Sequence, residues 1–244
     1  MLISGLQKLT LLDYHGRVAC TIFTVGCNLR CPFCHNAGLV LPEQLSALMS
    51  EGEALDFLRK RRGVLDGVAI TGGEPLLQKD MASFLSDVRE LGYKIKLDTN
   101  GCFPEKLIEI VKADLVDRVA MDVKNSPRLY GKTVGIEGFD IKNVEKSRDF
   151  LMEGHVEYEF RTTVVKGLHT VESIRQAAEW ISGAAEYYLQ QFKDSGMLLA
   201  GEGLESFDEE YMNTLLAAAA EFVPSVQLRG AQIVREPFGT GFSF

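Results

Sequence analysis

Short runs rich in Val, Ile, Phe and Thr alternate along the chain with longer stretches whose apolar residues recur at helical spacing. In Met81–Leu91, for example, charged residues separate apolar positions such as Phe84 and Val88, and Gly92 then supplies a C-terminal stop. The predicted strands are Val18–Thr24, Gly67–Thr71, Lys94–Thr99, Arg118–Val123, Tyr158–Val165, Tyr187–Phe192 and Val226–Leu228. The predicted helices are Glu53–Arg62, Met81–Leu91, Glu105–Lys112, Val144–Glu153, Val171–Ile181 and Glu209–Phe222.

This alternation is typical of an α/β protein in which right-handed crossovers join parallel strands. About six strand–helix units predict an open sheet, a partial (β/α)6 barrel of parallel strands rather than a closed eightfold one. The sequence contains no internal repeat, low-complexity run or Pro/Ser-rich linker. We therefore expect one domain over residues 1–244.

Residues able to do chemistry follow the predicted strands one after another. In open α/β sheets and in α/β barrels, ligands bind at the carboxyl edge of the strands. We therefore expect one active site at this edge. It would gather the cysteines after the first strand, Gly72–Pro75 after the second, Asp98–Gly101 and Asp122–Lys124 at the next two ends, and Arg161, Thr163, Gln190 and Gln191 within the fifth and sixth strands.

The overall composition is that of a soluble globular protein. The 244 residues include 26 Lys and Arg against 34 Asp and Glu, and the resulting net charge of −8 argues against a nucleic-acid partner. No apolar stretch approaches the ~20 residues of a spanning helix, and no signal peptide is visible at the N-terminus. Five cysteines, an odd number in a chain of this length, do not fit a disulfide scaffold. We therefore expect a cytoplasmic protein without a membrane partner.

Three cysteines fall within eight residues in a C-x3-C-x2-C pattern: Cys27, Cys31 and Cys34. Three thiolates on one tight loop can hold three corners of a 4Fe–4S cluster, and the missing fourth ligand leaves one iron open to a substrate. The alternatives are a structural zinc ion that recruits His35 and a redox pair of Cys31 and Cys34. Cys20 and Cys102 have no partners by spacing, so we expect them to be buried apolar residues.

With Phe33 before the last cysteine, this segment resembles the signature of the radical S-adenosylmethionine (SAM) superfamily. The resemblance implies a partial barrel of that type in which the three cysteines ligate a 4Fe–4S cluster. It also implies that the amino and carboxylate groups of SAM chelate the fourth iron and that Phe33 lies beside the adenine. Simple packing of Phe33 is the alternative.

Gly72-Gly73-Glu74-Pro75 resembles the second motif of this superfamily, which contacts the amino group of SAM. On physical grounds, two glycines permit the backbone to approach a ligand closely. The Glu74 carboxylate can accept a charge-assisted hydrogen bond from an ammonium group. Taken alone, the same four residues would also fit an ordinary turn.

Asp98 and Asp122 are expected at neighbouring strand ends, where their carboxylates would suit a hard cation. Alone, Asp98–Gly101 would fit a turn, and Asp122 and Lys124 a solvated pair. The glycyl-radical activating enzymes have similar D-T-N-G and D-x-K arrangements. That resemblance implies a monovalent cation beside the methionyl part of SAM, with Asp98, Thr99 and Asp122 as cation or cofactor ligands and Lys124 as a cofactor contact.

Arg161 matches an arginine that approaches the SAM carboxylate in those enzymes, and a guanidinium suits a bidentate carboxylate contact. Thr163, two residues further on, is predicted to contact the cofactor as well. A surface arginine on an edge strand is the alternative for Arg161.

The lead-in Gly5–Ala19 and the phrase Tyr188–Phe192 are similar to the short activating proteins for anaerobic ribonucleoside-triphosphate reductase. His15 stands where proline is expected in that lead-in. The late-strand histidine of pyruvate formate-lyase activating enzymes is not evident, and Gln190-Gln191 occupies its region, so the adenine contacts there stay open. The remaining histidines fit no motif and are predicted to be structural or exposed: His15, His155 and His169.

The resemblance implies that the enzyme reductively cleaves SAM and generates a glycyl radical on a partner, with anaerobic ribonucleoside-triphosphate reductase as the expected partner. A flavodoxin or ferredoxin is the expected electron donor. Pyruvate formate-lyase or another glycyl-radical enzyme is the alternative partner. Two further functions stay open, a radical enzyme that acts on a small molecule and a zinc-stabilised binding module.

Overall fold

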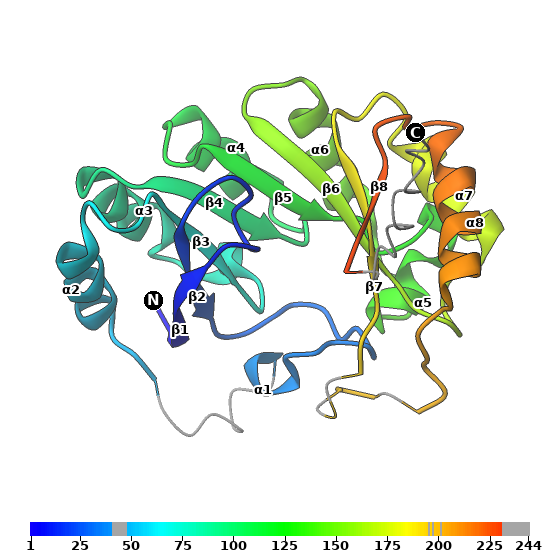
Figure 1. Cartoon of the computed structure of the whole chain (residues 1–244), viewed down its shortest axis with the longest axis horizontal. Helices are drawn as coiled ribbons and strands as arrows, with labels where there is room; N and C mark the ends of the chain where they lie inside the picture. Colours follow the sequence, from blue (N-terminus) through cyan, green and yellow to red (C-terminus); the bar gives the residue numbers. More distant parts are fainter. Residues whose placement is uncertain (41–47, 195, 197, 201, 231–244) are drawn as a thin grey trace, which may run out of the picture.

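The computed structural model describes residues 1–40, 48–194, 196, 198–200 and 202–230. Within these ranges the strands form one eight-stranded sheet in chain order, β1 to β8 (Figure 1). β1 runs antiparallel to β2, and every later neighbour is parallel. The strands are β1 (Ile3–Thr10), β2 (Ala19–Thr24), β3 (Gly67–Gly72), β4 (Lys94–Thr99), β5 (Arg118–Asp122), β6 (Glu157–Val164), β7 (Tyr187–Gln191) and β8 (Gln227–Arg229).

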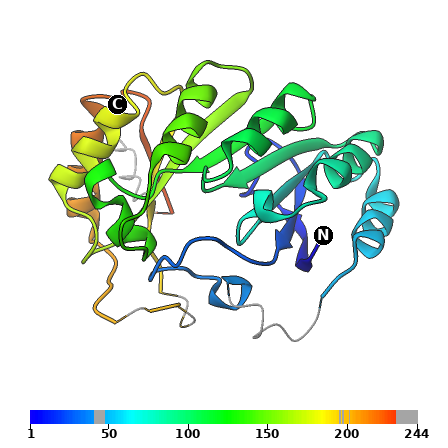
Figure 2. The ribbon, with the colours of Figure 1, turned by 180° about the vertical axis from the view of Figure 1, so that it is seen from behind.

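Most helices lie on the outer side of the curved sheet, with α2 and α3 at one end and α7 and α8 at the other, whereas α1 lies at the edge where β2 ends (Figures 1 and 2). Among the described residues no strand pairing joins β1 to β8, so the sheet is open over this part of the chain. The helices are α1 (Ala37–Val40), α2 (Glu51–Arg61), α3 (Met81–Glu90), α4 (Pro104–Lys112), α5 (Tyr130–Val134), α6 (Lys142–Met152), α7 (Val171–Trp180) and α8 (Glu209–Ala220), with 3-10 turns η2 (Pro75–Leu77) and η3 (Pro127–Leu129).

Side-chain caps define where several helices begin. Ser50 accepts a hydrogen bond from the Glu53 amide, and the Glu53 carboxylate accepts one from the Ser50 amide, which is a capping box. Thr170 and Ser173 form the same reciprocal arrangement before α7. Asp208 caps α8 by accepting from the Tyr211 amide. These local signals agree with the apolar periodicity, so helix starts and faces are specified together.

The predicted (β/α)6 architecture is confirmed, because each strand from β2 to β7 is followed by at least one helix and β8 ends the sheet. The sequence pattern missed β1, α1 and α5. β1 is an edge strand whose register with β2 shifts between Ile3 and Gly5 and between Gln7 and Thr10, so regular alternation is lost. The helices α1 and α5, at four and five residues, are too short to show a period.

Alternation along the strands separates an apolar outer face from a polar inner face. On β4, Lys96 and Asp98 share one face, whereas buried residues such as Leu97 point the other way, toward the helices. Glu159 and Arg161 of β6 lie within ion-pair distance of Lys96 and Asp98 respectively, so they belong to the same inner face. The inner surface of the sheet is therefore charged.

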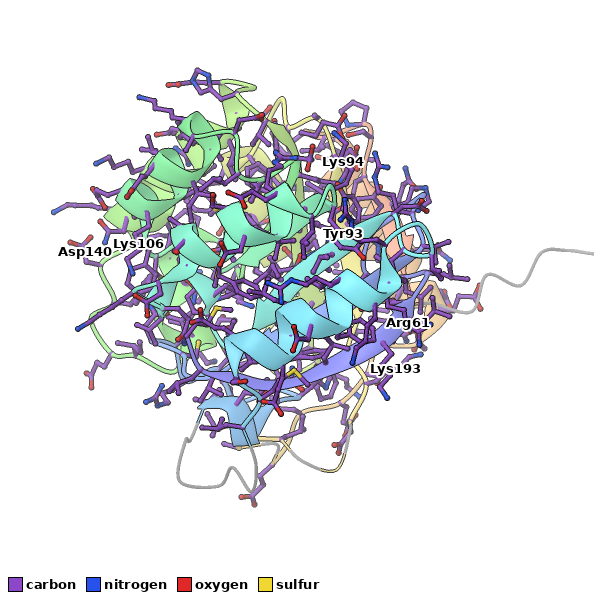
Figure 3. All side chains as sticks on the ribbon, turned by 90° about the vertical axis from the view of Figure 1, so that its left-hand side faces the viewer. Arg61, Tyr93, Lys94, Lys106, Asp140 and Lys193 are labelled. Atoms are coloured by element: carbon purple, nitrogen blue, oxygen red, sulfur yellow. The ribbon has the colours of Figure 1, made fainter. Side chains whose placement is uncertain are left out.

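The outer layer is tied to the sheet by packing and by polar contacts. Figure 3 looks onto this layer, with α2 and α3 in front and Tyr93 labelled. The Tyr93 hydroxyl donates to the Leu58 carbonyl of α2 over 2.7 Å.

Within the described residues, no helix combines the length and apolarity needed to cross a membrane.

Candidate active site

A cavity of about 420 Å3 opens at the carboxyl edge of the parallel strands. Its wall is formed by the loop after β2 and by the ends of β3, β4, β5, β6 and β7. All of the residues predicted to bind the cluster, the cation or SAM line this cavity except Glu74. In Figures 1 and 2 the segment from β2 to α1 runs along this edge of the sheet. The predicted residues therefore share one cavity at the carboxyl edge of the strands, and their roles there stay predictions.

The cysteine loop is held by backbone hydrogen bonds. The Leu29 amide lies 3.4 Å from the Cys27 sulfur, and the Cys34 amide donates to the Cys31 carbonyl over 3.0 Å. Cys27, Cys31 and Cys34 all line the cavity. Across residues 1–40, 48–194 and the shorter described segments, no three Cys, His, Asp or Glu side chains are close enough to hold a single metal ion. A 4Fe–4S cluster binds each thiolate to a different iron, so it does not need three ligands around one ion.

The thiols lie in a weakly solvated pocket. Burial raises the pKa of Cys31 to about 12, while the Lys124 ammonium acts in the opposite direction. Burial likewise raises the pKa of Cys27, which a hydrogen bond from the Leu29 amide partly offsets. Because metals bind thiolates, loading this centre must release protons.

The two glycines Gly72 and Gly73 bring β3 against the start of the cysteine loop. A Cβ on Gly73 would lie 2.0 Å from the Gly26 oxygen, and one on Gly72 would lie 2.3 Å from the Thr24 amide nitrogen. The Gly73 amide donates to Thr24 and the Glu74 amide to Gly26, over 3.0 and 2.8 Å. The glycines therefore allow a close approach of the chain's own loop, and the predicted approach to a ligand stays a prediction.

Glu74 is completely buried and does not line the cavity. One carboxylate oxygen accepts from the Leu76 amide and the Thr99 hydroxyl, over 3.0 and 2.9 Å. The other accepts from the Asn100 amide over 2.7 Å. Burial raises the pKa of Glu74 to about 7, against the opposing effect of these hydrogen bonds. Glu74 thus links the glycine turn to the end of β4, and its predicted contact with an ammonium group stays a prediction.

A row of alternating charges forms the opposite wall. Arg161 lies 3.0 Å from one oxygen of Asp98 and 3.0 Å from Asp122, and Lys124 lies 2.8 Å from Asp122. Although burial works to raise it, the pKa of Asp122 is lowered to about 2 by Arg161 and Lys124. Although burial works to lower them, the pKa values of Arg161 and Lys124 are raised by Asp122, and that of Arg161 by Asp98 as well. Both cations therefore stay charged beside the cavity.

This pairing bears on the predicted cation site. Asp98 Oδ1 is buried without a hydrogen bond, and Lys96 Nζ lies 2.9 Å from it without the alignment that a hydrogen bond needs. Each of the two carboxylates already has a protein cation as partner, Lys96 and Arg161 for Asp98, and Arg161 and Lys124 for Asp122. The cation site is thus not preformed, and it stays a prediction.

Some residues of the wall were given no role by the sequence analysis. Asn100 lines the cavity, where it was expected as part of Asp98–Gly101 but was assigned no contact. His35 also lines it and stacks on Phe192 at a ring distance of 5.5 Å, with a pKa lowered by burial. Gln190 takes its predicted place at the end of β7. Asn100 follows directly on two predicted residues, which is the signal that could have included it.

The bystander residues behave as predicted. Cys20 and Cys102 are buried. His169 is structural, since its ring accepts from the Val165 amide over 3.0 Å and lies 2.9 Å from the Lys124 carbonyl. His155 is exposed and stacks on Phe150.

The sequence model of the Radical SAM superfamily matches residues 21–211, a range that contains the cysteine loop and the strands around the cavity. The chain belongs to the radical SAM superfamily. Membership implies a 4Fe–4S cluster and SAM as cofactors, and the three sulfurs on one cavity wall fit such a cluster.

Relatives refine this placement. A protein of Methanocaldococcus jannaschii named as a glycyl-radical enzyme activating enzyme is 34% identical over 86% of this chain and 84% of its own length. A Thermococcus kodakarensis protein named as GTP 3′,8-cyclase is 26% identical over 66% of this chain, which spans about half (53%) of that relative. A solved domain of a pyruvate-formate lyase-activating enzyme from Bacteroides vulgatus has the same fold, with a TM-score of 0.55 and 17% identity over 67% of this chain and 99% of that one.

Proposed function

We propose that this radical SAM enzyme activates a glycyl-radical enzyme by generating a radical on one of its glycines. The observation that carries the proposal is the likeness to the M. jannaschii protein, which spans most of both chains. The match to the cyclase, by contrast, leaves about half of that longer protein without a counterpart. The fold shared with a domain of an activating enzyme agrees with the proposal.

In this proposal, Cys27, Cys31 and Cys34 hold the cluster, and the residues of the charged wall contact SAM. Lys124 and Arg161 offer cationic groups to the SAM carboxylate, for which a guanidinium is well shaped. When bound, the cluster and SAM together supply a carbon radical able to remove a hydrogen atom from a glycine Cα.

The chain itself supplies position, charge and shelter. The glycine turn holds the start of the partly buried cysteine loop through backbone hydrogen bonds, so the loop is positioned before any ligand arrives. Phe33 is nearly completely buried beside the cysteines, where it can cover an adenine ring and exclude water. Thr99 and Thr163 also line the cavity near the proposed SAM position.

The proposed partner is anaerobic ribonucleoside-triphosphate reductase, supported by the similarity of Gly5–Ala19 and Tyr188–Phe192 to its activating proteins. A flavodoxin or ferredoxin is the proposed electron donor. The test mixes reconstituted, reduced protein and SAM with this reductase or with pyruvate formate-lyase, and seeks a glycyl radical by electron paramagnetic resonance. We expect the signal with the reductase and none with the Cys31→Ala variant. A signal with pyruvate formate-lyase alone would overturn the partner and keep the activity.

A second candidate is a radical enzyme that acts on a small molecule, because a cyclase is among the relatives. Such an enzyme would form a modified small-molecule product from GTP and SAM without a partner protein. Finding that product, with no glycyl radical on either partner, would overturn the proposal.

A further inference from the structure

Asn100 connects three parts of the active site through polar contacts. Its backbone amide donates to Glu74 over 2.7 Å, and its side-chain oxygen accepts from the Cys102 amide over 3.0 Å. Its side-chain amide donates to the Asn28 oxygen over 2.9 Å and lies 3.9 Å from the Cys27 sulfur. Asn100 is only 5% exposed, so these contacts hold the carboxamide in one orientation.

This side chain differs from every other neighbour of the cysteines. Within the part of the chain that the structure describes, only the Leu29 amide and the Asn100 carboxamide direct an N–H group toward a sulfur of Cys27, Cys31 or Cys34. The Leu29 amide belongs to the cysteine loop itself. Asn100 therefore provides the one such contact from outside the loop, and its position depends on Glu74 and on the end of β4.

We infer that Asn100 is a positioning residue of the cysteine centre, which orients Cys27 and sets the electrostatic environment of its sulfur. An N–H dipole pointing at a thiolate ligand stabilises negative charge there, and one-electron reduction adds negative charge to the cluster. The reduction potential of the cluster should therefore depend on Asn100. This inference rests on the cluster of the proposed function and not on the identity of the partner.

Two substitutions separate this role from that of a simple turn residue. Asn100→Ala removes the N–H group and also the oxygen that caps the Cys102 amide. Asn100→Asp keeps a capping oxygen of the same shape and replaces the N–H donor with a carboxylate oxygen facing Asn28 and Cys27. A turn role alone predicts that the Asp variant resembles the wild type, whereas the positioning role predicts that it is the more strongly altered of the two.

The matched control is Asn143→Ala, because Asn143 donates to the Cys102 carbonyl over 3.2 Å, does not line the cavity and, among the described residues, has no hydrogen bond to a sulfur. The measurements are the midpoint potential of the reconstituted cluster, its electron paramagnetic resonance spectrum and the loss of iron to a chelator. The midpoint potential should be most negative for Asn100→Asp, less negative for Asn100→Ala, and least negative for the wild type and Asn143→Ala. Iron retention should fall about 10–100-fold, as is typical when a group behind a metal ligand is removed.

Potentials and spectra of both Asn100 variants equal to those of the control would overturn the inference. The inference would also be overturned if neither variant folds in its iron-free form, judged by circular dichroism. Asn100 would then serve the turn alone. If instead both fold and neither takes up iron, the positioning role is supported. A wild-type protein that takes up no iron would contradict the proposed function itself, which keeps the two failures distinct.

Discussion

Gly73→Ala should disrupt the active site although the change adds only one methyl group. The new Cβ would lie 2.0 Å from the Gly26 oxygen and 2.6 Å from the Gly26 carbonyl carbon. These are backbone atoms, so no side-chain rotation can relieve the clash, and β3 must separate from the cysteine loop. Gly26 directly precedes Cys27. The displacement therefore reaches the first cluster ligand.

The size of the effect follows from the clash and from the hydrogen bonds that the separation breaks. Overpacking a rigid site costs about 1–3 kcal/mol. The two backbone hydrogen bonds across this junction, from Gly73 to Thr24 and from Glu74 to Gly26, contribute about 0.5–1.5 kcal/mol each. The free energy of unfolding should therefore fall by about 2–6 kcal/mol, a large share of the 5–15 kcal/mol typical of a folded protein.

Urea unfolding of the iron-free protein, followed by circular dichroism, measures this loss, and iron analysis after reconstitution measures the damage to the loop. Gly5→Ala is the matched control, because no atom lies within 4 Å of the Cβ that it would add. We expect Gly5→Ala to resemble the wild type and Gly73→Ala to lose both stability and iron. If Gly73→Ala stayed within about 0.5 kcal/mol of the wild type, as a neutral surface change does, the packing argument would be refuted.

Three further predictions concern buried charges. Arg161→Gln leaves Asp98 and Asp122 without their shared cation, so unfolding free energy at pH 7 should fall by about 3–5 kcal/mol. In urea titrations that loss should shrink as the pH falls below about 4, the ordinary carboxyl pKa, toward the lowered pKa of Asp122 at about 2, and a constant loss would contradict the ion-pair account. Burial lowers the pKa of His169, so the unfolded chain binds more protons near about pH 6.5, and stability should fall below that pH. His169→Gln should flatten this pH dependence in thermal melts, and an unchanged slope would exclude His169 as its source. Glu74→Gln places an amide NH2 group opposite an N–H or O–H donor, so the free energy of unfolding should fall by about 1–3 kcal/mol. An unchanged free energy of unfolding would contradict this prediction.

The order of strands and helices could be predicted from the sequence because each βα unit repeats a short apolar run and an amphipathic helix. The strands β2 to β7 each begin and end within two residues of the prediction. A strand buried on both faces has a continuous apolar run, and a strand buried on one face has alternating apolar and polar residues, so both can be recognised in the sequence. β1 could not be predicted in this way. Its Gly5, its register shifts and its exposed edge remove the alternation, and its pairing with β2 depends on contacts distant in sequence.

The site could be predicted where chemistry and position coincide, as at Cys27 and Arg161, which both line the cavity. Spacing along the chain does not reveal what a side chain meets across the sheet. Glu74 therefore turned out to bind the end of β4 rather than to line the cavity, and Asn100 was missed as a neighbour of Cys27. Such contacts depend on the angle between strands and on the path of a loop.

The central claim is that Cys27, Cys31 and Cys34 hold the cluster with which this chain cleaves SAM. The most direct measurement is iron content and formation of 5′-deoxyadenosine after anaerobic reconstitution and chemical reduction, for the wild type, Cys31→Ala and Cys20→Ala. Cys20 is buried in the core and does not line the cavity, so its variant controls for the loss of a thiol. We predict about four irons and product for the wild type and Cys20→Ala, and neither for Cys31→Ala. Continued cleavage of SAM by Cys31→Ala would contradict the account.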